Sequence, residues 1–78
     1  MKNIKVGLIG FGTIGTGVAK ILSSNRELIK QRLGAWVDLI KIADLDIKTD
    51  RGISLAPDVL TIRADDVLVN PDIDVVVE

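Results

Sequence analysis

The sequence predicts an α/β fold in which a parallel sheet is flanked by helices. Apolar runs of strand length alternate along the 78 residues with stretches of helical periodicity, and this alternation is typical of parallel sheets. The last apolar run contains three consecutive valines, Val75–Val77, as expected of a strand that is covered on both faces. No helical stretch follows this run before Glu78. We therefore expect the truncated first half of a doubly wound domain.

Residues 4–33 predict one strand and two helices. Ile4–Ile9 is a short apolar run that leads into a glycine cluster, which predicts a buried strand. A helix is expected from Thr13 onwards, and Asn25 is a suitable N-cap for a second helix over Arg26–Leu33. The apolar residues that would form one face of the first helix are Ile14, Val18, Ile21 and Leu22.

The remaining elements follow between residues 37 and 77. Val37–Ala43 predicts the second strand, and the polar stretch Asp44–Pro57 predicts a loop. A short strand over Val59–Ile62, one or two helical turns over Asp65–Val69 and a last strand over Ile73–Val77 complete the order. Four acidic residues near these elements are expected to be caps and turn residues, without a metal or acid–base role: Asp65, Asp66, Asp72 and Asp74.

The composition excludes several classes of function. The sequence has no Cys and no His, so disulfides, the usual zinc sites and Cys-His or Ser-His-Asp catalysis are excluded within this chain. Ten basic and eleven acidic residues give a net charge of −1 without a basic block, which disfavours nucleic-acid binding. No apolar run approaches the roughly 20 residues that span a bilayer, and the N-terminus lacks a signal-peptide pattern. We expect a cytoplasmic protein with no membrane partner and no metal.

The residues between the first strand and the first helix form the pattern G-x-G-x-x-G, which is the fingerprint of dinucleotide binding in this context. Gly10 would permit a tight turn, Gly12 would let a pyrophosphate approach the backbone, and Gly15 would let the helix pack closely. The backbone amides around Thr13 and Ile14 would then point at the phosphates. A purely structural strand–turn–helix is the alternative.

The fingerprint also includes an acidic residue at the end of the second strand, which binds the adenosine ribose hydroxyls. Asp44 occupies this place. It lies 29 residues after Gly15, where about 20 is usual, and the predicted second helix accounts for the excess. Asp46 is the alternative ribose ligand, and a solvated loop residue is the third interpretation.

Two segments of the sequence resemble homoserine dehydrogenases. Residues 6–18, VGLIGFGTIGTGV, are similar to the G-x-G-T-V-G-x-G-V opening of that family, and residues 70–78, NPDIDVVVE, resemble its D-P-x-I-D-V-V-V-E segment. The resemblance spans nearly the whole chain. It implies a Rossmann-type fold in which residues 1–78 are the N-terminal part of a dinucleotide-binding domain and the substrate domain is absent from this chain.

The resemblance also implies an activity. Enzymes of this family interconvert L-homoserine and L-aspartate 4-semialdehyde with NAD(P), a step toward threonine and methionine. By resemblance, the backbone at Phe11, Thr13 and Ile14 helps to hold the cofactor, and the catalytic residues lie beyond Glu78. No catalytic residue is therefore assigned here, and the chain alone is expected to be inactive. We expect the full-length enzyme to act on a small amino-acid substrate and to be a homo-oligomer.

One departure from the family pattern concerns the cofactor. Many members carry an arginine at the position matching Leu45, where it can pair with the 2′-phosphate of NADP. This sequence has Asp44 and Leu45 there, and the nearest downstream basic residue is Lys48. A carboxylate suits the two ribose hydroxyls of NAD but repels a 2′-phosphate. We therefore place Asp44 and Leu45 in the cofactor site and expect NAD as the preferred cofactor, with NADP accepted at most equally well.

Two other functions fit the same residues. The second segment is shared with other Rossmann oxidoreductases, of the glucose–fructose oxidoreductase type or the aspartate dehydrogenases. A non-catalytic nucleotide-sensing module is the other alternative, because a fold does not by itself determine a function.

Overall fold

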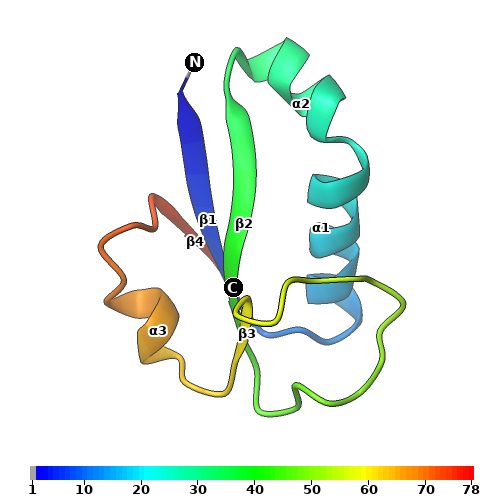
Figure 1. The fold of residues 1–78 in the computed structure, drawn as a ribbon, viewed down its shortest axis with the longest axis vertical. Coiled ribbons are helices and arrows are strands. Elements are labelled where there is room, and N and C mark those ends of the chain that lie inside the picture. The colour runs from blue at the N-terminus through cyan, green and yellow to red at the C-terminus, as the bar shows by residue number, and fades with distance from the viewer. Residues whose placement is uncertain (1) are drawn as a thin grey trace.

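The computed structural model describes residues 2–78, which form a four-stranded parallel sheet with helices on both sides (Figure 1). The strands lie in the order β3-β2-β1-β4, and every neighbouring pair is parallel. Their bounds are β1 (Asn3–Ile9), β2 (Trp36–Ala43), β3 (Leu60–Thr61) and β4 (Val75–Val77). The predicted α/β parallel sheet is confirmed, and its last two strands are shorter than the sequence indicated.

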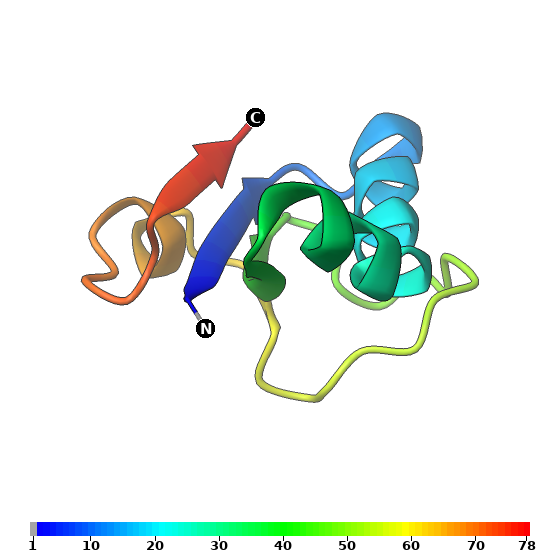
Figure 2. The ribbon, with the colours of Figure 1, turned by 90° about the horizontal axis from the view of Figure 1, so that it is seen from above.

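Three helices connect the strands. Helices α1 (Thr13–Ser24) and α2 (Arg26–Leu33) lie between β1 and β2, and α3 (Asp65–Leu68) lies between β3 and β4. Figures 1 and 2 show α1 and α2 on one side of the β1–β2 pair and α3 on the other. Asn25 separates the first two helices as predicted, but its side chain does not cap α2. Its Nδ2 donates instead to the carbonyl of Ile21 at 3.3 Å.

The main hydrophobic cluster lies between the sheet and α1. Its buried members are Leu8 of β1, Ile42 of β2, Ala19 of α1 and Phe11, each at most 2% exposed. The loop that follows β2 also contributes, because Ile53, Leu55 and Val59 pack against this cluster. The loop is therefore part of the core, although its sequence is largely polar.

The apolar face predicted for α1 is wrong at two of its four positions. Ile14 is 85% exposed and Ile21 is 58% exposed, whereas Thr16 and Ala19 are buried. Small side chains on the buried face let the helix approach the sheet closely. The larger apolar side chains then lie on its flanks.

Strand β4 forms one edge of the sheet and pairs only with β1. Val75 is 46% exposed and Val76 is 39% exposed, so residues 2–78 do not cover this strand on both faces as expected. Within the same residues, none of the helices has the length and apolar character needed to cross a membrane.

Gly7 lies in β1 opposite α3 and has no room for a side chain. A Cβ there would lie 2.7 Å from Cγ1 of Val67 and 2.7 Å from Cδ1 of Ile73, and Val67 is only 1% exposed. We predict that Gly7→Ala destabilises the fold by about 1–3 kcal/mol, the usual cost of overpacking. Gly17→Ala in α1 is the control, because a Cβ there meets nothing within 4 Å.

The control should stabilise the protein by up to about 1 kcal/mol, since alanine is the better helix former. Thermal and urea unfolding of the full-length protein measure both effects. Equal stability changes for the two variants would contradict this packing of β1 against α3.

Candidate functional site

The carboxyl ends of β1 and β2 meet at one edge of the sheet. Ile9, the last residue of β1, is in register with Ala43, the last residue of β2. The amide of Gly10 donates to the carbonyl of Ala43 at 2.8 Å, which continues the pairing one residue past the strand. The glycine turn and Asp44, which lie far apart in the sequence, are therefore brought together as predicted.

The turn from β1 into α1 leaves backbone amides without acceptors. Gly10 has a φ of 94°, a conformation that suits glycine. Helix α1 then begins directly after Gly12, whose carbonyl accepts from the amide of Thr16 at 2.8 Å. No side chain caps this helix start, and its first turn contains no acidic residue. The first amides of α1 are thus available to an external anion.

The glycines of the turn differ in what surrounds them. A Cβ on Gly15 would lie 2.2 Å from the carbonyl oxygen of Gly10, so no other residue fits this position without moving the backbone. A Cβ on Gly12 would meet nothing within 4 Å. Gly15 is therefore required by packing inside the protein, whereas Gly12 leaves open space above the backbone.

A hollow of about 440 Å³ lies against this turn. Gly10, Gly12 and Ile14 line one part of it, and Val77 with Glu78 lines another. The hollow is thus bounded by the turn on one side and by the end of β4 on the other. Ile14, which is 85% exposed, borders this hollow.

Asp44 links the end of β2 to the glycine turn. Its Oδ2 accepts a hydrogen bond from the amide of Phe11 at 2.6 Å, and its Oδ1 accepts from the amide of Asp46 at 2.8 Å. The hydrogen bonds from the amides of Asp46 and Phe11 lower the pKa of the Asp44 carboxyl group. Each carboxylate oxygen keeps a further lone pair for another donor.

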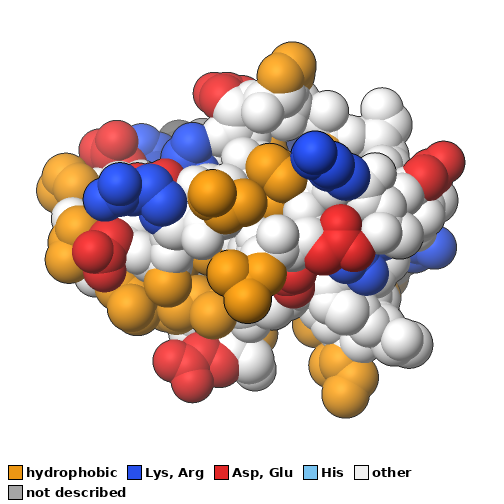
Figure 3. Space-filling view, turned by 90° about the horizontal axis from the view of Figure 1, so that it is seen from below, with side chains coloured by type: hydrophobic (Ala, Val, Ile, Leu, Met, Phe, Trp, Pro, Cys, Tyr) orange, Lys and Arg blue, Asp and Glu red, His pale blue; other side chains and the backbone are white. Residues whose placement is uncertain are grey.

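A second hollow, of about 310 Å³, lies beside Asp44. It is bounded by the ends of β1 and β2 and by the residues that follow β3. Its apolar lining includes Leu45, which is 92% exposed, and Ile62, which is 59% exposed. Figure 3 views the molecule from this end and shows hydrophobic side chains on the surface among acidic and basic ones.

Asp46 organises its own loop. Its Oδ1 accepts from the amides of Lys48 and Thr49, both at 3.1 Å, and its Oδ2 accepts from the hydroxyl of Thr49 at 2.5 Å. The hydrogen bonds from Thr49 and Lys48 lower the pKa of Asp46 to about 2. The hydrogen bonds of Asp46 thus fold the loop, whereas Asp44 contacts the glycine turn.

Phe11 contributes its backbone and its ring in different directions. The amide faces Asp44, and the carbonyl accepts from the hydroxyl of Thr16 at 3.2 Å. The ring is 2% exposed and belongs to the core. Sequence reasoning missed the residue that lies over this ring: the Arg51 guanidinium carbon is 5.2 Å from its centroid.

The prediction that the other acidic residues act as caps is wrong for α3, where no side chain caps the helix. Two of these residues instead join neighbouring segments. Asp66 accepts from the hydroxyl of Thr61 at 2.6 Å, and Asp74 accepts from the amide of Lys5 at 2.9 Å. Among residues 2–78, no three acidic, Cys or His side chains come together in a way that could hold a metal ion.

Comparisons with known proteins agree on one family. The sequence profile described as "Homoserine dehydrogenase, NAD binding domain" matches residues 10–78. Over its whole length the chain is 40% identical to homoserine dehydrogenase from Bacillus subtilis, and it covers 18% of that protein. It is 42% identical to homoserine dehydrogenase from Pseudomonas aeruginosa over 82 aligned positions, again covering 18% of the relative.

Solved structures give the same result. The fold is similar to that of homoserine dehydrogenase from Thiobacillus denitrificans, with a TM-score of 0.79 and 38% identity over 97% of this chain and 17% of that one. The enzyme from S. aureus matches with a TM-score of 0.84 and 29% identity over 97% of this chain and 19% of that one. The chain thus spans less than a fifth of the length of these relatives.

The contacts of Asp46 make the stability of the loop depend on pH. Its pKa is about 2 in the folded protein, against an ordinary value of 3.8. Because the folded-state pKa is depressed, this carboxylate stabilises the fold above the ordinary value, and the stabilisation is lost as the pH falls from about 4 toward 2. We predict that Asp46→Asn makes the melting temperature less dependent on pH in this range.

Thermal unfolding of the full-length protein between pH 2 and 7 measures this effect. Asp65→Asn is the matched control, because Asp65 is an exposed carboxylate in the first turn of α3, outside the Asp46 loop. The same pH dependence in wild type and Asp46→Asn would show that the Asp46 contacts do not stabilise the loop.

Proposed function

The chain belongs to the homoserine dehydrogenase family, and we propose that it forms the N-terminal part of the dinucleotide-binding domain of a longer homoserine dehydrogenase. The full-length enzyme would interconvert L-homoserine and L-aspartate 4-semialdehyde with NAD or NADP. The alcohol would be oxidised to the aldehyde by transfer of a hydride to the nicotinamide and of a proton to a base. The relatives named above are all homoserine dehydrogenases, which favours this activity over those of the other Rossmann oxidoreductases.

The observation that carries the proposal is the contrast between Gly12 and Gly15. Gly15 is required by a contact inside the protein, but nothing in the chain fills the space above Gly12. Gly12 is also the N-cap of α1, and no side chain caps this helix, so the open space lies in front of the amides of the first turn, where a ligand can approach the backbone closely. A pyrophosphate is such a ligand, because the free amides at the start of α1 point into the same space.

Each part of the site would hold a different part of the dinucleotide. The amides of Gly12, Thr13 and Ile14 would donate to the pyrophosphate oxygens. Asp44 would accept from the adenosine ribose hydroxyls with the lone pairs that its backbone contacts leave free. Leu45 would line the apolar hollow beside Asp44, where an adenine ring can be sheltered from water.

The catalytic chemistry would depend on residues outside this chain. A bound nicotinamide supplies the hydride acceptor, and the residues described here position it. None of them is offered as a proton donor or acceptor for the substrate, so the 78 residues alone should be inactive. A homo-oligomeric enzyme in the cytoplasm stays our expectation for the full-length protein.

We predict that Gly12→Val prevents dinucleotide binding without unfolding the protein. Valine would fill the space above the turn and separate the pyrophosphate from the amides. Hydrogen bonds to charged groups contribute about 1.5–3 kcal/mol each, so the loss of two weakens binding by about 100-fold or more. Fluorescence titration of NADH into the full-length enzyme measures the affinity, and circular dichroism checks the fold.

Ser24→Val is the control for this variant. It places a valine on the exposed last residue of α1, at the opposite end of the helix from the turn, and it should bind NADH as the wild type does. Unchanged NADH affinity in a folded Gly12→Val enzyme would mean that the turn is only structural.

A further inference from the structure

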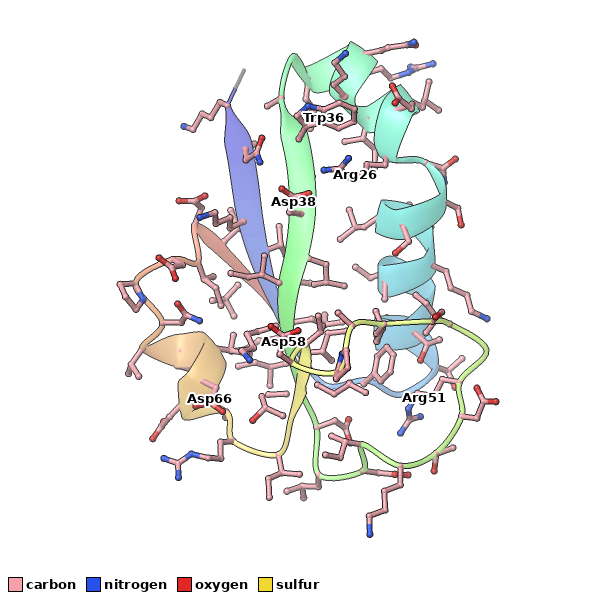
Figure 4. The ribbon with its side chains drawn as sticks, viewed as in Figure 1. Arg26, Trp36, Asp38, Arg51, Asp58 and Asp66 are labelled. Atoms are coloured by element: carbon pink, nitrogen blue, oxygen red, sulfur yellow. The ribbon has the colours of Figure 1, made fainter. Side chains whose placement is uncertain are left out.

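Arg51 is a cation beside the glycine turn that the sequence did not indicate. Its guanidinium covers the ring of Phe11, and the amide of Phe11 is hydrogen-bonded to Asp44. Its positive charge also contributes to the lowered pKa of Asp44. Asp46 connects Asp44 to Arg51, because its amide donates to Asp44 at 2.8 Å and its carbonyl accepts from Nη2 of Arg51 at 3.3 Å. A group on the ribose hydroxyls near Asp44 that extends toward the Asp46 carbonyl would therefore meet Arg51. Figure 4 shows Arg51 beside the loop that crosses the start of α1.

The polar contacts of Arg51 within residues 2–78 are few and long. Its Nη2 donates one long hydrogen bond, of 3.3 Å, to the carbonyl of Asp46, and lies 3.5 Å from the Oδ2 of the same residue. Its Nε is buried and finds no acceptor among residues 2–78. A guanidinium carries five N–H donors, so most of its capacity is unused. By comparison, Arg26 binds Asp38 at 2.6 Å at the opposite end of β2.

A hollow of about 370 Å³ adjoins Arg51 and reaches the glycine turn. Gly12 and Thr13 line it on the side of the turn, and Lys20 of α1 lines it together with Arg51. The ammonium of Lys20 faces the loop, since a Cβ on Gly52 would lie 3.4 Å from its Nζ. Two cations therefore border a space that begins where the pyrophosphate is expected.

Three carboxylates lie in the same region and limit this positive charge. Asp50 lines the hollow and accepts from the amide of Gly52 at 2.9 Å. Asp44 accepts from the backbone on both of its oxygens. Asp46 is the partner of Arg51 and is the only one of the three that forms an ion pair within residues 2–78. Asp46 is therefore the carboxylate that pairs with the guanidinium of Arg51 within the protein.

We propose that Arg51 binds the 2′-phosphate of NADP, with Lys20 assisting, and that Asp46 is the internal carboxylate which this phosphate displaces. The inference rests on the proposed function, because it requires the adenosine ribose at Asp44. It deepens that function by assigning a cation to the 2′-phosphate of NADP, because this chain has Leu45 where many members of the family have an arginine. The enzyme then accepts NAD through Asp44 and NADP through Arg51. A phosphate forms short, bidentate contacts with a guanidinium, which the long Asp46 contact does not provide.

Binding measurements on the full-length enzyme test the assignment without relying on turnover. The ligands are NADP and NAD, together with the fragments 2′,5′-ADP and 5′-AMP, which differ only in the 2′-phosphate. Arg51→Gln should weaken NADP and 2′,5′-ADP by about tenfold or more, the loss expected for one charge-assisted contact. The affinities for NAD and 5′-AMP should change by less than about threefold, and Arg51→Lys should restore part of the NADP affinity.

Asp46→Asn separates this role from a structural one. Asparagine keeps an acceptor for the loop amides but loses the charge that occupies Arg51, so the affinity for NADP should rise while that for NAD stays the same. Arg26→Gln is the matched control, because Arg26 also contacts an aspartate and lies 4.3 Å from the ring centroid of Trp36. It should change the affinity for neither cofactor.

The outcomes separate this inference from the function on which it rests. If Arg51→Gln and Asp46→Asn both weaken NAD and NADP alike, Arg51 only holds the loop and the inference is wrong. If the wild type binds NAD but not NADP, the inference is wrong and the proposed function stands. If the wild type binds neither dinucleotide, both are overturned.

Discussion

The hydrogen bond from the amide of Phe11 to the carboxylate of Asp44 is the contact on which the site depends. It joins the turn after β1 to the residue that follows β2, and the bond from Gly10 to Ala43 lies directly beside it. Together they fix the path of the turn before any ligand is present. The amides at the start of α1 and the free lone pairs of Asp44 are therefore held in one arrangement, and a ligand does not have to order them.

The same turn is constrained from the helix side. Gly15 lies so close to the carbonyl of Gly10 that a side chain is excluded, and the buried Thr16 donates to the carbonyl of Phe11. Helix α1 thus packs its small residues against the turn and the sheet, and its larger apolar residues stay exposed.

The sequence alone predicted the parallel sheet, the helices, and the positions of the glycine turn and Asp44 at the ends of β1 and β2. Apolar periodicity predicted α1, the position of Asn25 predicted the start of α2, and the glycine pattern predicted the turn, because these features depend on residues close in sequence. The position of Arg51 could not be predicted in this way. It depends on how an aperiodic loop folds back over Phe11, which is decided by the packing of Ile53 and Leu55 on the core. The buried face of α1 was missed because hydrophobicity alone does not report how closely two backbones approach.

A structure of the full-length enzyme with bound NAD tests the central claim most directly. The account predicts that the pyrophosphate lies above Gly12 and accepts from the amides at the start of α1, that the adenosine ribose hydroxyls donate to Asp44, and that the bond between Asp44 and Phe11 stays intact. A dinucleotide bound elsewhere, or one whose ribose does not contact Asp44, would contradict it.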